Sequence, residues 1–562
     1  MDLIPEKIPN KENLVSLTKM LMDNYGFDNF NYECLYKTAT DVLRLAVSLS
    51  DGDISLSSKS KFKKFSKAES RFLLKLLNNC KYPLEDMWRY RTEWIRLGEI
   101  IHPGSYAKRY PNAFSNFDKL RNEKKIPSFA GKVENAFNTK DLSDLLKLIS
   151  YRPGEFSTRL YRCLVEFTND NEKILSELSK VLNKVETTVI IRLMEHMKDR
   201  KINMTERLFF PKGSISKMYI KENNLGFIDT IYIDKTIELC ESTLKEIFST
   251  KDSLGKVYID EEMKKYIFPM VLRTASRTLK PMARGSKISL KENCKVARMF
   301  LYWQDAETEV TDLDLSAIYL NEDFGYVNDC YYGNYNYKEV LSLGGYHSGD
   351  VREAPNGASE YIDLNLETLK ENNIAYAIIS VHSFTKNPFS DLRDCYVGVM
   401  ERENPLSGEI FEPSTIVNKS DLISNQLTSL SCVLDVYNKE IIWLDLGLNL
   451  SDTEEVANNI KKDTSQVISS IKNFKNRNFI NIYDLVQLNV ASRGELVDNK
   501  ADADYIISLE GYIEPEVEEV EVVETVQDTE TEITEEPETE VIIPKRELIT
   551  PYNLDKLIAM FL

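Results

Sequence analysis

The chain of 562 residues and 64.9 kDa is too long for one ordinary domain, and we expect about two to four. Its 42% hydrophobic residues can bury a substantial core, and its net charge of −18 argues against binding nucleic acid through bulk charge. Eight cysteines without a CxxC pair argue against a disulfide framework or a zinc ribbon and favour a reducing cytoplasm.

The N-terminus has charged residues where a signal peptide needs an apolar run. No window of the sequence approaches the roughly 18 consecutive apolar residues of a membrane-spanning helix. We therefore expect a cytoplasmic protein with no transmembrane segment.

Apolar residues recur at three- and four-residue spacing from about residue 10 to 280, as in DLSDLLKLIS at 141–150. This periodicity predicts an N-terminal all-α domain over residues 1–280, which we expect to contact other proteins. Aromatic and arginine side chains alternate in MWRYRTEWIRL at 87–97, and five lysines lie within 57–67. Either stretch could meet nucleic acid, but a packed Trp face and a solvated loop are more usual, so we expect no nucleic-acid partner.

Near residue 285 the pattern changes to short segments rich in β-branched and aromatic residues. Examples are VTDLDLSAIYL at 310–320 and VLDVYNKEIIWLDL at 433–446, which reads as two strands around a turn at Asn438-Lys439. About seven such strands predict an antiparallel β-sandwich over residues 281–450. Parallel α/β architecture is disfavoured there because few helical crossovers separate the strands.

The remaining sequence predicts a helical extension of the sandwich over 451–512, an acidic disordered linker over 513–545 and a terminal helix over 546–562. The stretch from Glu514 to Glu540 has 13 acidic residues and no basic one, so removing its charge from the total of −18 leaves −5 on the rest of the chain. The terminal helix is apolar on one side and is predicted either to dock on a partner protein or to fold back on its own domain. The residues assigned to this docking face are Leu554, Leu557, Ile558 and Phe561.

Common catalytic signatures are absent: there is no GxxxxGK[ST], HExxH, GxSxG or GxGxxG. Three acidic loops are the most informative feature instead. Asp312 and Asp314 lie two apart in a predicted strand, which points both carboxylates to one side, where like charges repel unless a cation lies between them. Loops ending in Asp350 and Glu360 follow, and Asn356 adds an amide oxygen. Calcium prefers six to eight oxygen ligands, which this set could supply in part. The alternative is that these acids only cap turns on a solvated surface.

These segments resemble the TerD family, bacterial tellurium-resistance and stress proteins whose β-sandwich binds calcium. The resemblance covers about 285–450 and rests on TDLDLSAIYL (311–320), GYHSGD (345–350), the loop before YIDLNL, SVHSF (380–384) and FSDLRDCYVGVMER (389–402). It implies calcium ligands among Asp312, Asp314, Asp350, Asn356 and Glu360.

The loop at 354–360 departs from this family. Members commonly have the acid-dense GDGDDE there, whereas this chain has APNGASE. Fewer carboxylates imply weaker calcium binding, or loss of one of the two sites usual for the family. We assign His347 and Ser348 to hydrogen bonds around the ligands, because calcium prefers oxygen.

Motifs outside the sandwich resemble long bacterial proteins that place a helical region before a TerD-like domain. They are IHPGSY (101–106), RPGEF (152–156), FPKG (210–213) and ARGS (283–286). The clustered Cys and His of the RING-type zinc module found in some of those relatives are missing here. The fold class we expect is therefore multidomain α+β, an all-α domain followed by a TerD-like sandwich.

Three functional hypotheses follow. The first is a non-enzymatic, calcium-binding scaffold in a bacterial or phage stress-response or defence system of the tellurium-resistance type. The second is a structural or assembly protein of a larger particle, with self-association and a degenerate calcium site. The third, an enzyme using His102, Arg152 and Glu155 of the helical domain, is disfavoured because no nucleophile and base occur together.

Overall fold

Helices near the N-terminus begin where side chains can cap them. Thr38 and Ser66 each accept a hydrogen bond from the backbone amide three residues further on, and Asp41 and Glu69 accept one from the amide of the capping residue. The computed structural model describes the following residues: 8, 10–26, 33–123, 128–202, 204–209, 219–270, 280–307, 309–334, 338–402, 408–423, 425–448, 464–511 and 546–562.

The chain folds as two units, Met1–Tyr151 and Arg152–Leu562. The first unit is helical, as the periodicity predicts, and consists of α1 (Lys11–Tyr25), α2 (Ala39–Ser48), α3 (Lys67–Asn79), α4 (Pro83–Arg89), α5 (Arg91–Ile101), α6 (Pro111–Asn122), α7 (Phe129–Asn138) and α8 (Leu142–Ser150). Within it Trp94 is buried, and the guanidinium of Arg91 lies 5.1 Å from the ring centroid of Trp88. The aromatic and arginine stretch therefore packs within its own unit.

The second unit starts with further helices: α9 (Pro153–Glu166), α10 (Asn171–Ser179), α11 (Thr187–Asp199) and α12 (Thr230–Ser249). Between the last two lies an antiparallel hairpin of β1 (Glu206–Phe209) and β2 (Tyr219–Glu222). The division after Tyr151 falls inside the range predicted as one helical domain. The hairpin also lies inside that range. It was not predicted, because strands of four residues are too short to be seen within a helical pattern.

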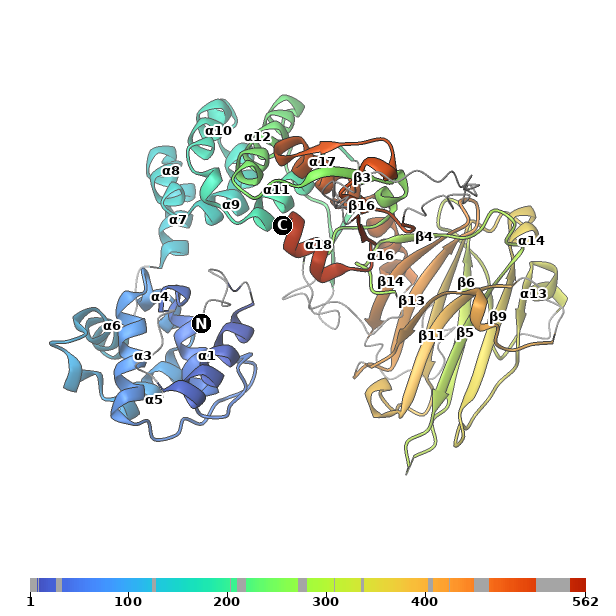
Figure 1. Cartoon of the computed structure of the whole chain (residues 1–562), viewed down its shortest axis with the longest axis horizontal. Coiled ribbons are helices and arrows are strands. Elements are labelled where there is room, and N and C mark those ends of the chain that lie inside the picture. Colours follow the sequence, from blue (N-terminus) through green and yellow to red (C-terminus); the bar gives the residue numbers. More distant parts are fainter. Residues whose placement is uncertain are drawn as a thin grey trace, which may run out of the picture. The chain divides into compact units, whose positions relative to one another are not determined.

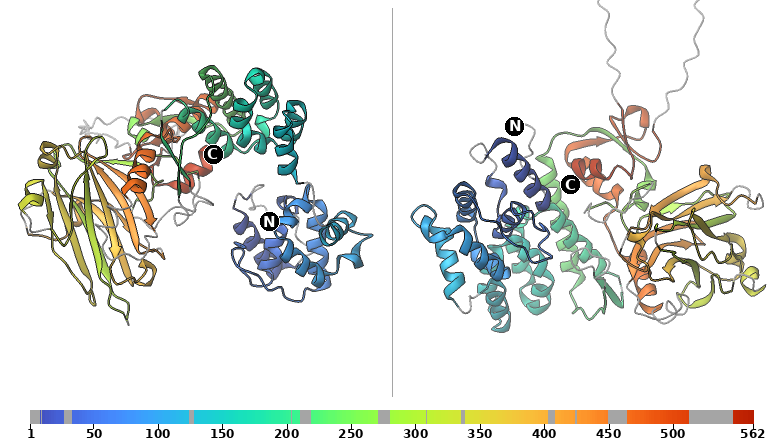
Figure 2. Two further views of the ribbon diagram at one scale, coloured as in Figure 1. Left: turned by 180° about the vertical axis from the view of Figure 1, so that it is seen from behind. Right: turned by 90° about the horizontal axis from the view of Figure 1, so that it is seen from below.

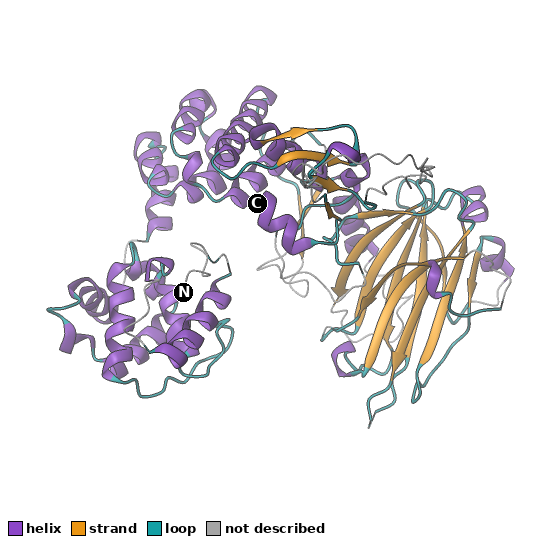
Figure 3. Ribbon diagram, in the orientation of Figure 1, coloured by secondary structure: helices purple, strands orange, loops and turns teal. Residues whose placement is uncertain are grey.

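Two antiparallel sheets with one common core form the largest part of this unit (Figures 1 and 3). The six-stranded sheet has the order β4-β14-β13-β10-β6-β7, and the five-stranded sheet has the order β12-β11-β5-β9-β8. The strands are β4 (Lys287–Ser289), β5 (Val296–Gln304), β6 (Leu313–Leu320), β7 (Tyr326–Cys330), β8 (Gly345–His347), β9 (Ala358–Asn365), β10 (Tyr376–Ser383), β11 (Asp394–Arg402), β12 (Ile416–Asp421), β13 (Thr428–Asp435) and β14 (Glu440–Leu448). Short helices α13 (Lys338–Ser342) and α14 (Leu366–Glu371) lie between strands.

Alternation places every second side chain of a strand in this core. Leu313 and Leu315 of β6 belong to the same buried cluster as Met299 and Leu301 of β5. The tight turn expected between β13 and β14 is present, with Lys439 in a left-handed conformation at φ 50°. The antiparallel sheets predicted after residue 281 are therefore confirmed.

The strands of a small parallel sheet lie before and after the antiparallel sheets in the sequence. Its order is β15-β3-β16-β17, with β3 (Gly255–Ile259) before the sandwich and β15 (Gly494–Leu496), β16 (Tyr505–Ile507) and β17 (Glu547–Ile549) after it. The antiparallel sheets are thus inserted between two strands of another sheet. Strands of three to five residues have too few positions for a readable pattern, so the sequence predicted helix alone around them.

Helix α16 (Thr464–Asn476) connects the sandwich with the rest of the second unit. Its Ile471 and Phe474 are buried with Ile318 and Ile442 on the outer face of the six-stranded sheet, and Leu208 of the hairpin belongs to the same cluster. Figures 1 and 2 show α16 beside β13 and β14. Of the helical extension predicted over 451–512, residues 451–463 lie outside the described part of the chain, α16 and α17 (Ile482–Arg493) are helical, and β15 and β16 are strands.

The terminal helix, α18 (Leu554–Phe561), packs on its own unit. Leu554, Leu557 and Phe561 are buried, Ile558 is half-buried, and the side-chain amide of Asn489 on α17 donates to the Phe561 carbonyl at 3.0 Å. This is the fold-back alternative, and docking of α18 on a separate partner stays a prediction. The predicted acidic linker, residues 513–545, lies outside the described residues. Among the described helices, none combines the length and apolar character needed to cross a bilayer.

Candidate metal centre

Three predicted ligands come together at one end of the sandwich. Asp312 precedes β6, Asp314 is its second residue, and Asp350 follows β8. One carboxylate oxygen from each lies within 4.8 Å of the other two. Asp314 is buried, at 3% exposure, while Asp312 and Asp350 are half-buried. The period-two spacing therefore brings the pair together as expected, and the loop after β8 supplies the third carboxylate.

Asp312 and Asp314 lie in surroundings that disfavour their negative charge. Burial, and then the neighbouring charges of Asp312 and Asp350, raise the pKa of Asp314 to about 7. Burial and Asp350 also raise the pKa of Asp312. In addition, Oδ1 of Asp312 is buried and has no hydrogen-bond partner within the described part of the chain. A cation between these groups would remove both the repulsion and the unmet acceptor.

Arg352 is the basic side chain that contacts this cluster. Its Nε donates to Oδ2 of Asp350 at 2.9 Å, and its positive charge also acts on Asp312 and Asp314. The side chain is 78% exposed, so water screens the pair and the ion pair is weak. Arg352 therefore offsets part of the negative charge and would compete with any metal ion for Asp350. The sequence analysis missed this residue.

Glu360, a fourth predicted ligand, is fully buried and already bonded to backbone. Oε2 accepts from the amide of Leu315 and Oε1 from the amide of Val351, both at 3.0 Å. Strand β7 pairs with β6 only from Leu320 back to Ala317, so the Leu315 amide has no strand partner on that side. Glu360 thus completes the edge of β6 and fixes the start of the loop after Asp350. Burial raises its pKa to about 8.

His347 and Ser348 hold the backbone around the cluster, in the role expected for them. Nε2 of His347 lies 3.0 Å from the Leu315 carbonyl oxygen, and Nδ1 accepts from the Gly349 amide at 3.0 Å. Nε2 therefore has the proton in the neutral ring, and burial lowers the His347 pKa to about 4. Oγ of Ser348 accepts from the Tyr361 amide at 2.9 Å. Gly349 has φ 108°, a conformation that a side chain would strain.

Asn356, the fifth predicted ligand, is exposed in the turn before β9. Its amide makes no hydrogen bond within the described residues, so nothing in the fold fixes it against the three aspartates. A role as ligand stays a prediction for Asn356.

Asp305 connects two of the loops and was not found from the sequence. It is buried, and its two oxygens accept from the Thr311 amide at 3.0 Å and from the Ala354 amide at 2.8 Å. One bond fixes the segment leading to Asp312 and the other fixes the loop between Asp350 and Glu360. A single aspartate directly after a strand has no sequence signature, because its two partners are six and 49 residues away.

The donor set fits a hard divalent cation. Calcium takes six to eight oxygens at about 2.3–2.6 Å, in flexible arrangements that combine carboxylates, carbonyls and water. Three carboxylates within 4.8 Å of one another supply part of that set, and the partnerless oxygen of Asp312 is one of them. Glu360 and His347 are not among the three clustered ligands, and their hydrogen bonds to backbone give them a supporting role.

Comparison with protein-family models finds none that matches the chain, and comparison with curated proteins finds no match either.

Proposed function

We propose that this chain is a non-enzymatic, TerD-like scaffold whose sandwich binds calcium through Asp312, Asp314 and Asp350. The observation that carries the proposal is the cluster of three carboxylates with a raised Asp314 pKa and a buried, unpartnered oxygen on Asp312. Bound calcium would favour the ionised carboxylates and fix the loops that contain Asp312 and Asp350 against each other. The stress-response or defence role rests on the resemblance of the motifs alone.

The buried state of the thiols supports a binding role rather than covalent catalysis. Seven of the eight cysteines are buried, and burial raises the pKa of each, as for Cys294 at about 11. His347 is likewise buried and His382 is half-buried; both have lowered pKa values and hydrogen bonds inside the sandwich. These groups are therefore suited to packing and positioning.

Calcium-dependent thermal stability of the full chain tests the proposal. Calcium at about 100 times its Kd should stabilise the metal-bound unit by about 2.7 kcal/mol. Asp312→Asn with Asp314→Asn should abolish this gain, whereas magnesium should give less of it. The matched control is Glu322→Gln with Asp323→Asn, which removes two exposed charges from the β6–β7 turn of the same sheet. Equal stabilisation of the control and the Asp312/Asp314 variant would overturn the proposal.

A further inference from the structure

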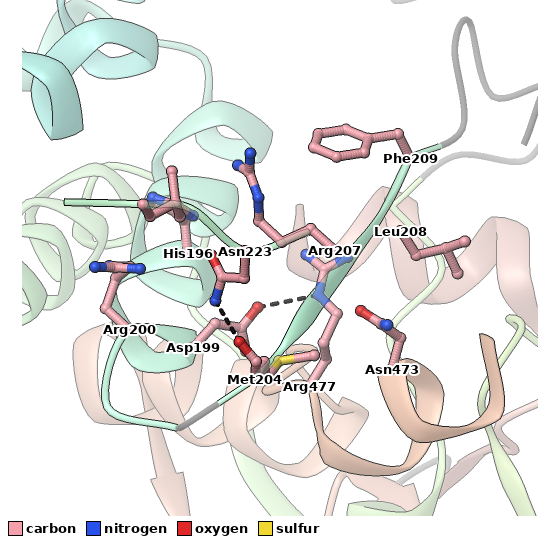
Figure 4. Close-up of a pocket in the computed structure, with 11 residues that line it drawn as sticks. His196, Asp199, Arg200, Met204, Arg207, Leu208, Phe209, Asn223, Asn473 and Arg477 are labelled. Atoms are coloured by element: carbon pink, nitrogen blue, oxygen red, sulfur yellow. Dashed lines mark hydrogen bonds and ion pairs between the residues drawn. The ribbon is translucent and has the colours of Figure 1, made fainter. Parts of the chain in front are cut away.

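A cavity of about 110 Å³ lies where α11, the β1–β2 hairpin and α16 meet, away from the aspartate cluster. This is several times the roughly 10–15 Å³ that one water molecule needs. Figure 4 shows the side chains that line it, which come from separate segments of the chain. They are His196, Asp199, Arg200, Met204, Arg207, Leu208, Phe209, Asn223, Leu225, Asn473 and Arg477.

The lining is predominantly positive. It has three arginines against one carboxylate, and that carboxylate is fully used: Oδ2 of Asp199 accepts from Nε of Arg477 at 3.0 Å, and Oδ1 accepts from the Asn478 amide at 2.8 Å. Burial, together with the charges of Arg200, Arg207 and Arg477, lowers the His196 pKa to about 4. The imidazole is therefore neutral, and the cavity has an excess of positive charge.

Arg207, like Arg200, has no counterion within the described residues. Its guanidinium lies 5.0 Å from the ring centroid of Phe209, and it makes no ion pair or side-chain hydrogen bond within the described residues. Its Nε is buried without a partner, as is that of Arg200, whose NH2 group donates to the Gly226 carbonyl at 2.7 Å. Both residues are half-buried, and a buried N–H donor without an acceptor is costly.

Asn223 adds an acceptor to these donors. Its Nδ2 donates to the Met204 carbonyl at 2.6 Å, which fixes the orientation of the amide, and its Oδ1 is buried without a hydrogen-bond partner among the described residues. A ligand that satisfies both Arg207 and Asn223 must accept several hydrogen bonds and donate one. Hydrogen phosphate and a protonated phosphate ester do both, whereas sulfate has no proton to donate.

We propose that this cavity binds a phosphate group, with Arg207 as its main cation and Oδ1 of Asn223 accepting the phosphate proton. Arg477, held by Asp199, adds positive charge at the side of α16. The planar fork of arginine matches the geometry of phosphate oxygens. Because α16 also packs on the six-stranded sheet, the anion would connect the hairpin, α11 and the sandwich face.

Calorimetric titration of the full chain with inorganic phosphate, in a phosphate-free buffer of low ionic strength, tests this site. Arg207→Gln should weaken phosphate binding about ten- to a hundredfold, since it removes charged hydrogen bonds. Arg192→Gln is the matched control: Arg192 is exposed on α11 and does not line the cavity, so its loss should leave the affinity unchanged within about twofold. Arg207→Lys, which keeps the charge, should bind phosphate with intermediate affinity. This second variant tests the role of the charge even if the glutamine variant misfolds.

Titrations with two other anions distinguish the kind of ligand that the cavity binds. Sulfate should bind at least about tenfold more weakly than phosphate, because it leaves Oδ1 of Asn223 unpaired. Adenosine 5′-monophosphate binding more tightly than inorganic phosphate would assign the site to a phosphate ester, and the reverse order would assign it to free phosphate. Absence of saturable phosphate binding, equal affinity for sulfate, or unchanged binding in Arg207→Gln would each overturn the proposal. The Asp312/Asp314 variant should still bind phosphate, which separates this site from calcium binding.

Discussion

The aspartate cluster and the arginine cavity have opposite charge but share two structural features. Each contains a side chain with a buried polar atom that has no hydrogen-bond partner among the described residues, Asp312 in the first and Arg207 in the second. In each, a neighbouring carboxyl group is already bonded to backbone, Glu360 in the first and Asp199 in the second. The difference between the partnered and unpartnered groups separates the residues that build a site from those that would bind a ligand.

The two sites differ in how far apart their residues lie in sequence. The three aspartates come from one stretch of 39 residues, whereas the arginine cavity joins residues around 200, 223 and 475. A short stretch of loops with a strand alternation can be recognised as a carboxylate site. Three arginines on two helix ends and a hairpin cannot be recognised as a site, because no sequence pattern indicates that those elements lie together.

The largest effect should come from removing a supporting residue. Glu360→Ala leaves the buried amides of Leu315 and Val351 without acceptors, so the second unit should lose about 2–4 kcal/mol of stability without metal. Denaturation of the full chain, followed by fluorescence of the buried Trp303 and Trp443, measures this loss.

The matched control is Glu353→Ala, which removes an exposed carboxylate from the same loop and should change stability by less than about 0.5 kcal/mol. If both variants are equally stable, Glu360 is not a support and the distinction between the two kinds of residue fails.

A pH dependence should follow from the raised pKa values of Asp314, about 7, and Glu360, about 8. The folded state binds these protons more tightly than the unfolded chain, so stability without metal should fall as pH rises through those values. Between pH 6.5 and 8.5 the expected loss is about 2–3 kcal/mol. Below this window His196, His347 and His382, with pKa values lowered to about 4, act in the opposite direction.

Denaturation midpoints across pH 6.5–8.5, with and without calcium, check this expectation. Saturating calcium should flatten the curve because it favours the ionised carboxylates, and Asp314→Asn should remove part of the slope in the metal-free protein. Stability that is independent of pH, or that rises, would show that the carboxylates are not held in the protonated form.

The smallest effect concerns Arg352, the exposed partner of Asp350. Its removal as Arg352→Gln should tighten calcium binding by only about two- to fivefold, since water screens an exposed ion pair. Calcium affinity at low and high salt measures this. Weaker binding in the variant would mean that Arg352 organises the site instead of competing for it.

Much of the fold could be predicted from residue patterns. Apolar spacing indicated the helices of the first unit, and alternation indicated the antiparallel sheets and the turn at Lys439. The small parallel sheet could not be found, because β3 and β16 are short and lie about 250 residues apart. The boundary after Tyr151 could not be found either, since helices continue on both sides of it.

At the candidate site, the sequence indicated Asp312, Asp314 and Asp350, because strand alternation and loop position both follow from local pattern. It could not distinguish Glu360 from them: the two backbone amides that Glu360 accepts from become known only once the edge of β6 is seen. Asp305 was missed for the same reason, since its partners lie six and 49 residues away. Arg352 was missed although its partner Asp350 is only two residues away, because one arginine in a loop has no distinguishing pattern.

Calorimetric titration of the full chain with calcium at pH 7, in two buffers of different ionisation enthalpy, tests the central claim most directly. The account predicts saturable binding that releases protons from the aspartate cluster, because the Asp314 pKa lies near 7. Both the binding and the proton release should disappear in the Asp312→Asn, Asp314→Asn variant and persist in the Glu322→Gln, Asp323→Asn control. No saturable binding up to millimolar calcium, or unchanged binding in the aspartate variant, would contradict the account.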